Sequence, residues 1–357
     1  MKLCLERNIP FVTYRLPGAG NRVVVWVQRS GRMLFVEDIH EVAGKKGFVY
    51  APFHRMTNFP VVFFEPEYIG GMEALEDSLI SDIEAGPALY PDYDHDVPFE
   101  VGRPEYLRQA GKMISSFGPG LSKAVLSRVK CVDRPVDFEP ALFFLDLVQA
   151  YPQAFCHLIN IPGAGCWAGA SPEGLLRIDG KLATTVALAG TRNHETGHGV
   201  PWGQKEIEEQ EMVTRHIQSV LLACGIKDYT LEGPQTVRAG NVEHLSTRFS
   251  FSPGPGKFDT GSFLQQLHPT PAVSGLPKDA ALDLIRDTEK HNREYYAGYC
   301  GPINYGESTE LFVNLRCMKI LPRQLGVFAG GGLTGLSIPA DEWQETEWKA
   351  KTLLTFI

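Results

Sequence analysis

Short apolar runs separated by glycine, proline and asparagine dominate the first hundred residues. They read NRVVVWVQRS (21–30), RMLFVED (32–38), GFVYAPF (47–53) and PVVFFEP (60–66). Runs of this length that are rich in valine and aromatic residues predict β-strands. Residues 1–100 are therefore expected to form a β-rich N-terminal part.

Helical patterns appear at five places farther along the chain. Pro104 and Pro277 suit the first position of a helix, where the missing N–H is not needed, and Gly225 suits a C-terminal cap. The helices are predicted at residues 103–117, 140–155, 202–225, 277–295 and 339–357.

Runs of apolar and β-branched residues return between these helices. The strands are predicted at residues 121–133, 155–163, 165–180, 181–192, 243–251, 301–306, 311–321 and 324–333. Because the strands come in runs and do not alternate strictly with helices, the predicted fold class is α+β with large antiparallel β-sheets and flanking helices. The stretch QLHPTPAVSGLPK (266–278) is predicted to be a stiff loop, because neither a helix interior nor a central strand tolerates so much proline.

Composition and charge narrow the functional classes. The 357 residues carry a net charge of −8, which gives no basic surface for nucleic acid or an anionic membrane. No apolar run approaches the roughly 20 residues of a membrane span, and the start MKLCLERNIPF lacks a cleavage motif. The seven cysteines form no CxxC pair, so we expect a reduced, cytoplasmic protein without a disulfide framework or a zinc site.

Two predicted helices each carry a pair of glutamates three residues apart, namely Glu206 with Glu209 and Glu342 with Glu345. This spacing places both side chains on one helical face. Two such faces could supply the oxygen ligands that Mg²⁺ prefers. The alternative is a solvated helix surface with ordinary ion pairs.

Lys123 and Glu173 are candidates for acid–base chemistry. Lys123 lies in the apolar strand KAVLSR, where it is either an edge lysine that discourages aggregation or a buried amine able to act as a base. Glu173 follows a proline between two apolar segments, where it is either a turn residue or a general acid whose pKa is raised.

Arg316 is predicted inside the central-looking strand VNLRCMK, where a buried guanidinium needs either an anionic ligand or a structural ion-pair partner. The glycines of ALAGTR and AGGGL indicate close approach of the backbone to another group, although turns also need glycine. His244 and His268 have no metal-ligand spacing and would ordinarily be structural.

Taken in order, these motifs resemble those of the chorismate-utilising enzymes, the family that includes isochorismate, salicylate, anthranilate and aminodeoxychorismate synthases. The resemblance covers residues 120–357, with residues 1–100 as the variable β-rich part, and implies one chorismate-binding domain over residues 1–357 with an anthranilate synthase component I-like fold. The motifs are KAVLSR, GASPEGLLR, ALAGTR, KEIEEQ, VEHLSTRF, HPTPAVSGLPK, REYYAGYCG, VNLRC, FAGGGL and EWQETEWK.

Three of these motifs resemble the water-adding members of the family. HPTPAVSG is similar to the isochorismate synthase form, and KAVLSR contains the lysine that these members use as a base. Ala189 stands where aminodeoxychorismate synthases carry a nucleophilic lysine. The resemblance therefore implies an isochorismate synthase of a menaquinone or siderophore pathway, and it leaves a monomer or a homodimer open.

The resemblance also implies a role for each matching residue. Lys123 would deprotonate the attacking water, and Glu173 would protonate the departing 4-hydroxyl. Glu209 and Glu345 would bind Mg²⁺ with support from Glu206 and Glu342. Substrate binding would fall to Gly190, Thr191, His244, Tyr296, Arg316, Gly330, Gly332 and Lys349.

Gln210 departs from the family pattern, because the family usually has histidine after the second glutamate of KExxE. This difference could change a group that supports the metal ligands. AGGGL in place of the commoner AGAGI is a milder departure.

Three alternatives to an isochorismate synthase stay open. A salicylate synthase would form isochorismate and then eliminate pyruvate with the same catalytic residues. A non-catalytic chorismate-binding subunit would bind without turnover. A Mg²⁺ phosphohydrolase would use only the carboxylates, and the sequence lacks the phosphate-binding motif GxxxxGK[ST].

Overall fold

The computed structural model describes residues 1–357 except residues 31, 55–58, 72–79, 82, 84–96, 198, 240–241, 254–257 and 307. The acidic stretch MEALEDSLISDIEAG (72–86) and the turn-rich stretch YPDYDHDVP (90–98), whose composition predicts a mobile or surface connection, lie mostly outside the described residues. No helix in the described part of the chain is both long enough and apolar enough to cross a membrane.

Two sheets, each with nine strands among the described residues, form the body of the molecule, and every pair of neighbouring strands there is antiparallel. The α+β class with large antiparallel sheets is therefore confirmed. In spatial order, the first sheet contains β14 (Gly275–Leu276), β7 (Lys123–Asp133), β18 (Gln324–Thr334), β17 (Cys317–Ile320), β9 (Gly165–Ser171), β8 (Phe155–Ile161), β1 (Phe11–Arg15), β2 (Val24–Val27) and β6 (Tyr68–Gly70).

The second sheet contains, in spatial order, β12 (Tyr229–Ala239), β13 (Val242–Phe251), β11 (Leu182–Asn193), β10 (Gly174–Asp179), β16 (Ser308–Val313), β15 (Tyr299–Ile303), β4 (Gly47–Ala51), β5 (Val61–Phe64) and β3 (Met33–Val36). The N-terminal strands extend both sheets, because β1 pairs with β8 in the first and β4 pairs with β15 in the second. Six strands among the described residues 11–70, β1 to β6, thus belong to the same two sheets as the rest of the chain.

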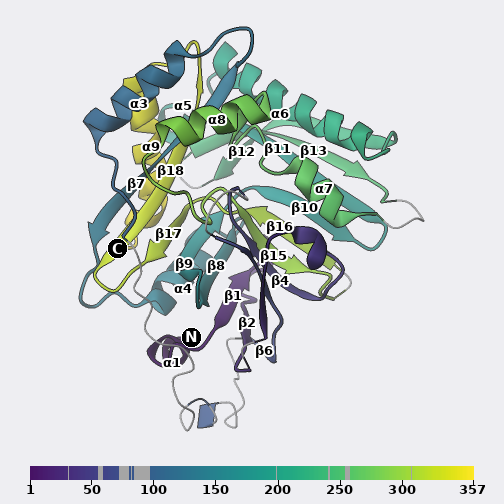
Figure 1. Ribbon diagram of the computed structural model, residues 1–357, viewed down its shortest axis with the longest axis vertical. Helices are drawn as coiled ribbons and strands as arrows, with labels where there is room; N and C mark the ends of the chain where they lie inside the picture. The colour runs from purple at the N-terminus through teal and green to yellow at the C-terminus, as the bar shows by residue number, and fades with distance from the viewer. Residues whose placement is uncertain are drawn as a thin grey trace.

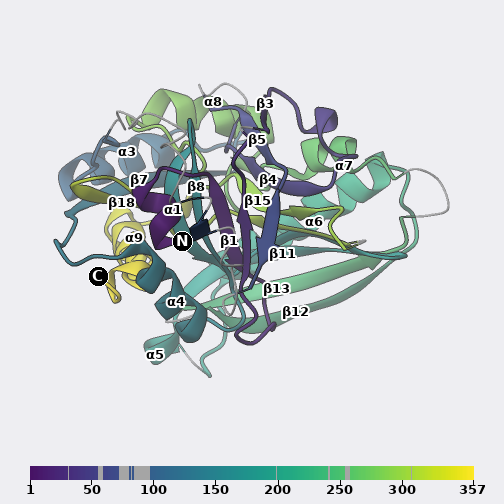
Figure 2. The same ribbon diagram turned by 90° about the horizontal axis from the view of Figure 1, so that it is seen from below.

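The helices cover the outer faces and ends of the sheets (Figures 1 and 2). α4 packs on β8 and β9, α6 packs on β11 and β13, and α3, α8 and α9 gather around β7 and β18. The helical elements are α1 (Lys2–Glu6), η1 (Ile39–Glu41), α3 (Arg103–Ser115), α4 (Pro140–Ala150), α5 (His194–Gly197), α6 (Gln204–Ala223), α7 (Thr260–Leu267), α8 (Lys278–Thr288) and α9 (Pro339–Leu354).

Strand β8 shows why the first sheet is apolar on both faces. Phe155 and Ile159 belong to the core between the sheets, whereas Cys156 and Leu158 belong to a second core under the helices. All seven residues of β8 are buried, including His157 and Asn160, so the strand shows no alternation of buried and exposed positions. Both faces of this part of the sheet are therefore covered.

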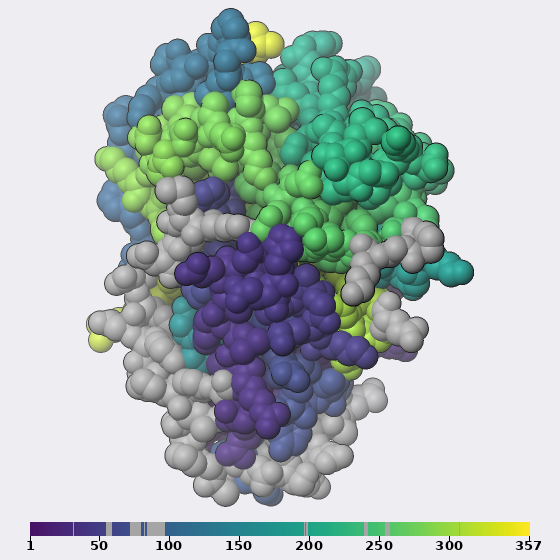
Figure 3. All heavy atoms as spheres, turned by 45° about the vertical axis from the view of Figure 1, so that its right-hand side comes forward, coloured from purple at the N-terminus to yellow at the C-terminus, as the bar shows by residue number. Residues whose placement is uncertain are grey.

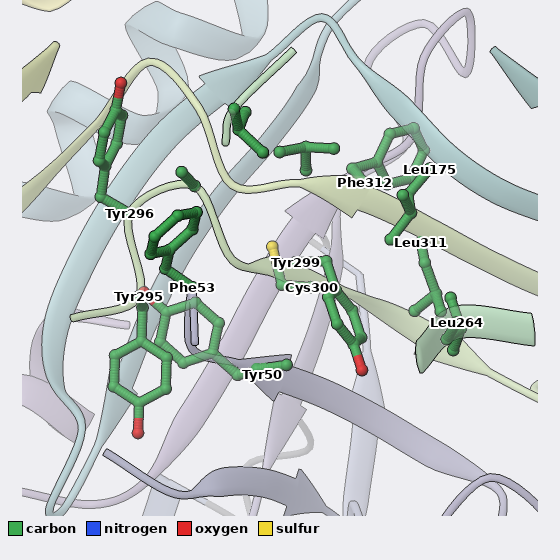
Figure 4. Close-up of a cluster of buried hydrophobic side chains, with 14 of the residues drawn as sticks. Tyr50, Phe53, Leu175, Leu264, Tyr295, Tyr296, Tyr299, Cys300, Leu311 and Phe312 are labelled. Atoms are coloured by element: carbon green, nitrogen blue, oxygen red, sulfur yellow. The ribbon is translucent and has the colours of Figure 1, made fainter. Parts of the chain in front are cut away.

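Aromatic side chains join the N-terminal part to the remainder of the core. Tyr50 of β4 stacks on Tyr295 with 4.1 Å between ring centroids, and both are labelled in Figure 4. Figure 3 shows the N-terminal residues in purple directly below the green atoms of the α7 and α8 region. The contact between η1 and α7 lies in this region.

The predicted strand 311–321 is two strands in the structure, and this prediction was wrong. β16 ends at Val313 and β17 begins at Cys317. Arg316, in the gap, has φ of +48°, a left-handed conformation incompatible with a continuous strand. The predicted helix 277–295 also ends early, at Thr288.

Candidate active site

A cavity lies where β7 and β18 of the first sheet meet β11 and β13 of the second, under α6 and α9. Twelve of the fourteen candidate site residues line it; Glu206 and Glu342 do not. The lining comprises Lys123, Val125, Pro172, Glu173, Leu188, Ala189, Gly190, Thr191, Glu209, His244, Ala272, Val273, Tyr296, Ala297, Leu315, Arg316, Phe328, Ala329, Gly330, Gly332, Glu345 and Lys349.

Lys123 is a buried amine and not an edge lysine. It begins β7, between β14 and β18, and its residue is only 1% exposed. Its Nζ lies 3.7 Å from Oε2 of Glu209. A Cβ at Gly332, on the neighbouring strand, would lie 2.8 Å from Cε of Lys123, so the glycine leaves the room that the lysine occupies.

Glu173 lies in the short connection between β9 and β10, with a carboxyl that lines the cavity. Its carbonyl accepts a hydrogen bond from the N–H of Val313 at 3.0 Å, which fixes the connection to the last residue of β16. Burial raises the pKa of Glu173 to about 8, although Lys123, Lys349 and Arg316 act in the opposite direction. The side chain is therefore a protonated acid at neutral pH.

Three glutamates gather with lysines at one end of the cavity. Nζ of Lys349 lies 2.6 Å from Oε1 of Glu345, and Nζ of Lys205 lies 2.5 Å from Oε1 of Glu342. Lys205 also approaches Oε1 of Glu209 at 3.9 Å. The helices α6 and α9 thus meet through the ion pair between Lys205 and Glu342.

The chemistry of these carboxylates fits a divalent cation. Burial and the neighbouring Glu345 raise the pKa of Glu342 to about 7, which indicates that the carboxylates compete for positive charge. Oε2 of Glu342 is buried and has no hydrogen-bond partner among the described residues. In the described part of the chain, however, no three acidic, histidine or cysteine side chains are close enough to enclose a metal.

Glu206 differs from the other glutamates in its orientation. A Cβ at Gly203 would lie 2.5 Å from Oε2 of Glu206, so the carboxylate turns back toward the start of α6. The Cβ of Glu206 packs against Gly190, since a Cβ added at Gly190 would lie 3.0 Å from it. Gly190 has φ of +66° and forms a bulge in β11 between Ala189 and Thr191.

Arg316 and His244 form a polar wall of the cavity. Burial, Arg316 and Lys349 lower the pKa of His244 to about 3, so the ring is neutral. Its Nδ1 lies 2.9 Å from the carbonyl oxygen of Gly190 and therefore carries the proton. Its Nε2 then accepts a hydrogen bond from Nη2 of Arg316 at 3.3 Å.

The guanidinium of Arg316 retains capacity for an anion. It has no ion pair among the described residues, which excludes a structural salt bridge there. Its Nη1 is buried without a hydrogen-bond partner in the same part of the chain. Because a buried unpaired donor is costly, a carboxylate in the cavity would stabilise this arrangement.

Gly330 and Gly332 let β18 form the floor of the cavity, and Gly331 between them faces Glu342 and Glu345 of α9. A Cβ at Gly330 would lie 2.9 Å from the hydroxyl oxygen of Tyr296, and one at Gly331 would lie 3.2 Å from Oε2 of Glu342. Nζ of Lys349 donates to the carbonyl oxygen of Gly330 at 2.8 Å. Thr191, whose Oγ1 lies 3.2 Å from Nδ1 of His244, completes the opposite side.

The proline-rich stretch forms one wall. Gln266 and Leu267 end α7, residues 268–274 are a loop, and Lys278 begins α8. Ala272 and Val273 line the cavity, and the carbonyl oxygen of Ser274 accepts from the N–H of Val125 at 2.8 Å. The predicted loop therefore lies against the strand that carries Lys123.

Sequence reasoning missed Lys205 and the role of Gln210. Lys205 lies four residues before Glu209, a spacing that could have identified it. Gln210 is buried, accepts from the N–H of Ala189 at 3.0 Å, and donates to the carbonyl oxygen of Ala187 and to Oγ1 of Thr247. It therefore fastens α6 to β11 and β13.

Comparison with known proteins gives one family and several relatives. A family described as chorismate binding enzyme matches residues 102–357. Isochorismate synthase EntC of Escherichia coli K12 is 30% identical over 244 residues, which are 66% of this chain and 62% of that protein. The salicylate biosynthesis isochorismate synthase of Pseudomonas aeruginosa is 35% identical over 68% of this chain and 52% of its own length. The chain thus matches less than two thirds of the length of these relatives.

Solved structures share the fold. DhbC from Bacillus anthracis, described as a 2,3-dihydroxybenzoate-specific isochorismate synthase, superposes with a TM-score of 0.78 at 21% identity, covering 98% of this chain and 96% of that chain. Anthranilate synthase component I from Streptococcus pneumoniae superposes with a TM-score of 0.70 at 17% identity, covering 96% and 90%. The expected anthranilate synthase component I-like fold is confirmed.

Proposed function

The chain belongs to the family of chorismate-binding enzymes, and we propose that it is an isochorismate synthase, which converts chorismate to isochorismate. The observation that carries the proposal is the presence of two buried groups of opposite function in one cavity. Lys123 can act as a base, and Glu173, whose pKa burial raises to about 8, can act as an acid. Relatives named isochorismate synthases support the same reaction.

The reaction requires one proton acceptor and one proton donor. Lys123 takes a proton from water as its oxygen bonds to C2 of the ring. The ring double bonds shift, and the bond between C4 and its hydroxyl oxygen breaks. Glu173 gives its proton to that oxygen, which leaves as water, and proton exchange with solvent restores both residues. Each positioned group is worth roughly 10²–10⁴ in rate.

Local positive charge would hold the dianionic substrate. The chain as a whole has a net charge of −8, so binding depends on a few placed cations. Arg316, with its unpaired Nη1, and the hydroxyl of Tyr296 would bind the enolpyruvyl carboxylate. Backbone N–H groups near Gly330 and Gly332 would assist, and Thr191, His244 and Lys349 would line the site.

A bound Mg²⁺ would supply positive charge for the ring carboxylate. Glu209 and Glu345 would hold the ion, with Glu342 beside them, and this assignment rests on their charge and on the unpaired Oε2 of Glu342. Glu206, whose carboxylate turns toward Gly203, could contribute only after a change of rotamer or through water.

The test is conversion of chorismate by the purified protein. Protein, chorismate and Mg²⁺ are incubated with and without EDTA, products are separated by chromatography, and pyruvate is assayed in parallel. Isochorismate in equilibrium with chorismate, lost with EDTA, is the expected result. Salicylate with pyruvate would instead identify a salicylate synthase. Binding of chorismate without turnover would overturn the proposed enzyme activity.

A further inference from the structure

A buried ion pair lies behind the cavity and outside its lining. Glu289 follows the last residue of α8, and Arg293 lies four residues farther on. Nε of Arg293 donates to Oε2 of Glu289 at 2.8 Å, and Nη2 donates to Oε1 at 2.6 Å. Their side chains are 1% and 4% exposed. Sequence analysis assigned neither residue a role.

Arg293 joins two parts of the cavity wall. Its Nη1 donates to the carbonyl oxygen of Val273 at 2.8 Å, and its Nη2 donates to that of Val125 at 2.7 Å. Val273 belongs to the proline-rich loop, and Val125 lies two residues after Lys123 on β7. Both valines line the cavity. One guanidinium therefore sets the spacing between the loop and the strand that carries the base.

Glu289 holds the same strand at a second point. Its Oε1 accepts from the N–H of Ser127 at 2.7 Å and from Oγ of Ser127 at 2.9 Å. Ser127 Oγ also lies 2.8 Å from Nε2 of His291. β7 is thus held at Val125 by the arginine and at Ser127 by the glutamate, immediately after Lys123.

The surroundings favour the charged form of Glu289 and keep both side chains of the pair away from solvent. Burial opposes ionisation of Glu289, but Arg293 and His291 outweigh it and lower the pKa of the carboxyl. The guanidinium carbon of Arg293 lies 4.2 Å from the ring centroid of Phe53, an N-terminal residue labelled in Figure 4. Bidentate, charge-assisted bonds in such a site are strong and directional.

We propose that Glu289 and Arg293 are positioning residues that fix the loop at 268–274 relative to Lys123. The proposal rests on the proposed function, because it concerns the geometry of that reaction. β14 has only two residues, so its backbone pairing with β7 is short. The side chains of the ion pair supply the additional links that hold Val273 over the cavity. A displacement of about 1 Å in such a wall can lower a rate by about 10².

The chain offers a matched control in a second buried ion pair. Nζ of Lys319 lies 2.7 Å from Oε2 of Glu294, with side chains 7% and 6% exposed. Neither residue lines the cavity. Glu289→Gln and Glu294→Gln therefore make the same chemical change in similarly buried ion pairs. Of the two carboxylates, that of Glu289 is the one bonded to Ser127 and to the arginine that holds Val125 and Val273.

The experiment measures kcat, KM, melting temperature and amide hydrogen exchange for both variants with chorismate and Mg²⁺. We expect similar losses of melting temperature, but a kcat lower by about 10–10² only in Glu289→Gln, with KM changed by less than about threefold. Exchange in peptides covering residues 268–276 should also be faster only in this variant. Equal kcat in the two variants would overturn the proposal.

A second variant protects the test against a folding defect. Arg293→Lys keeps the charge but loses the fork that reaches both carbonyl oxygens. We expect it to share the loss of kcat, and a wild-type kcat would contradict the positioning role. If the wild-type protein does not convert chorismate, the proposed function fails. Hydrogen exchange in residues 268–276 then decides alone whether the ion pair fixes the loop. Equal exchange in Glu289→Gln and Glu294→Gln would overturn the positioning role.

Discussion

Lys123 and Glu209 face each other inside the cavity, with 3.7 Å between Nζ and Oε2. The lysine comes from β7 and the glutamate from α6, and both residues are less than one tenth exposed. A buried amine and a buried carboxylate at this distance depend on each other, since removing one leaves the other without its polar partner. The proposed base and the proposed metal site are therefore electrostatically coupled, and a change in one is expected to affect the other.

Replacing Lys123 by alanine should greatly lower turnover while substrate binding survives. We expect kcat to fall by about 10²–10⁴, the contribution of a positioned base. Lys130→Ala is the matched control, because Lys130 lies on the same strand but pairs with Glu347 and does not line the cavity. Steady-state kinetics and calorimetric binding of chorismate with Mg²⁺ measure the two effects. Near-wild-type turnover in Lys123→Ala would exclude the assigned role.

The rate should fall at alkaline pH because Glu173 must be protonated to act as an acid. With a pKa of about 8, the group keeps its proton at neutral pH and loses it above that value. We expect kcat to decrease about tenfold per pH unit beyond about pH 8. Glu173→Gln should be slower by about 10²–10⁴ and should lack this decrease. A pH–rate profile of both proteins, with folding checked by circular dichroism, is the measurement.

The same carboxyl should make stability depend on pH. The pKa of Glu173 rises from 4.5 to about 8 on folding, so the folded state binds the proton more tightly. The free energy of unfolding should therefore fall as pH rises between these values, by at most about 1.4 kcal/mol per unit. Glu173→Gln should remove this contribution. Urea unfolding of both proteins at pH 5, 7 and 9 would reveal this contribution. The same dependence of the free energy of unfolding on pH in both proteins would refute the prediction.

Adding a methyl group at Gly332 should disturb the base. The new Cβ would lie 2.8 Å from Cε of Lys123, a side chain that burial prevents from moving freely. We expect Gly332→Ala to lose about 1–3 kcal/mol of stability through overpacking and to lower kcat at least tenfold. Gly335→Ala is the control, because nothing lies within 4 Å of its added Cβ. Thermal unfolding and kinetics distinguish the two.

The glutamates should differ in their effect on Mg²⁺. Glu345 lines the cavity, so Glu345→Gln should raise the Mg²⁺ concentration for half-maximal rate by about 10–100-fold. Glu206, turned toward Gly203, should matter less, with a change below about threefold for Glu206→Gln. Titration of activity with Mg²⁺ after treatment with EDTA measures both. Equal effects would show that Glu206 reaches the ion.

The sequence pattern identified most of the elements around the site because their apolar periods are strong. β7, β11, α6 and α9 lie where the runs predicted them, and these elements supply Lys123, Thr191, Glu209 and Glu345. Family motifs then singled out side chains that are far apart in sequence. Their assembly in one cavity followed from the pairing of strands, which no local pattern reveals.

The failures of prediction have tertiary causes. Arg316 interrupts an apolar run that otherwise looks like one strand, because its left-handed backbone is stabilised by the surrounding fold and not by a local glycine. α8 ends at Thr288 although its sequence continues in a polar, helix-compatible manner, since Glu289 and Arg293 are used to hold β7 and the loop. Such residues look like ordinary surface charges until the fold is known.

Helix α9 contributes Glu345 and Lys349 to the cavity, and Lys123, the proposed base, also lines it. The site therefore joins residues separated by more than half of the chain. During synthesis the acid, the base and most of the wall emerge from the ribosome well before α9. Because the proposed site is incomplete until α9 docks, the appearance of activity after dilution from denaturant would report the docking of this helix, which a probe of β-structure alone would not follow.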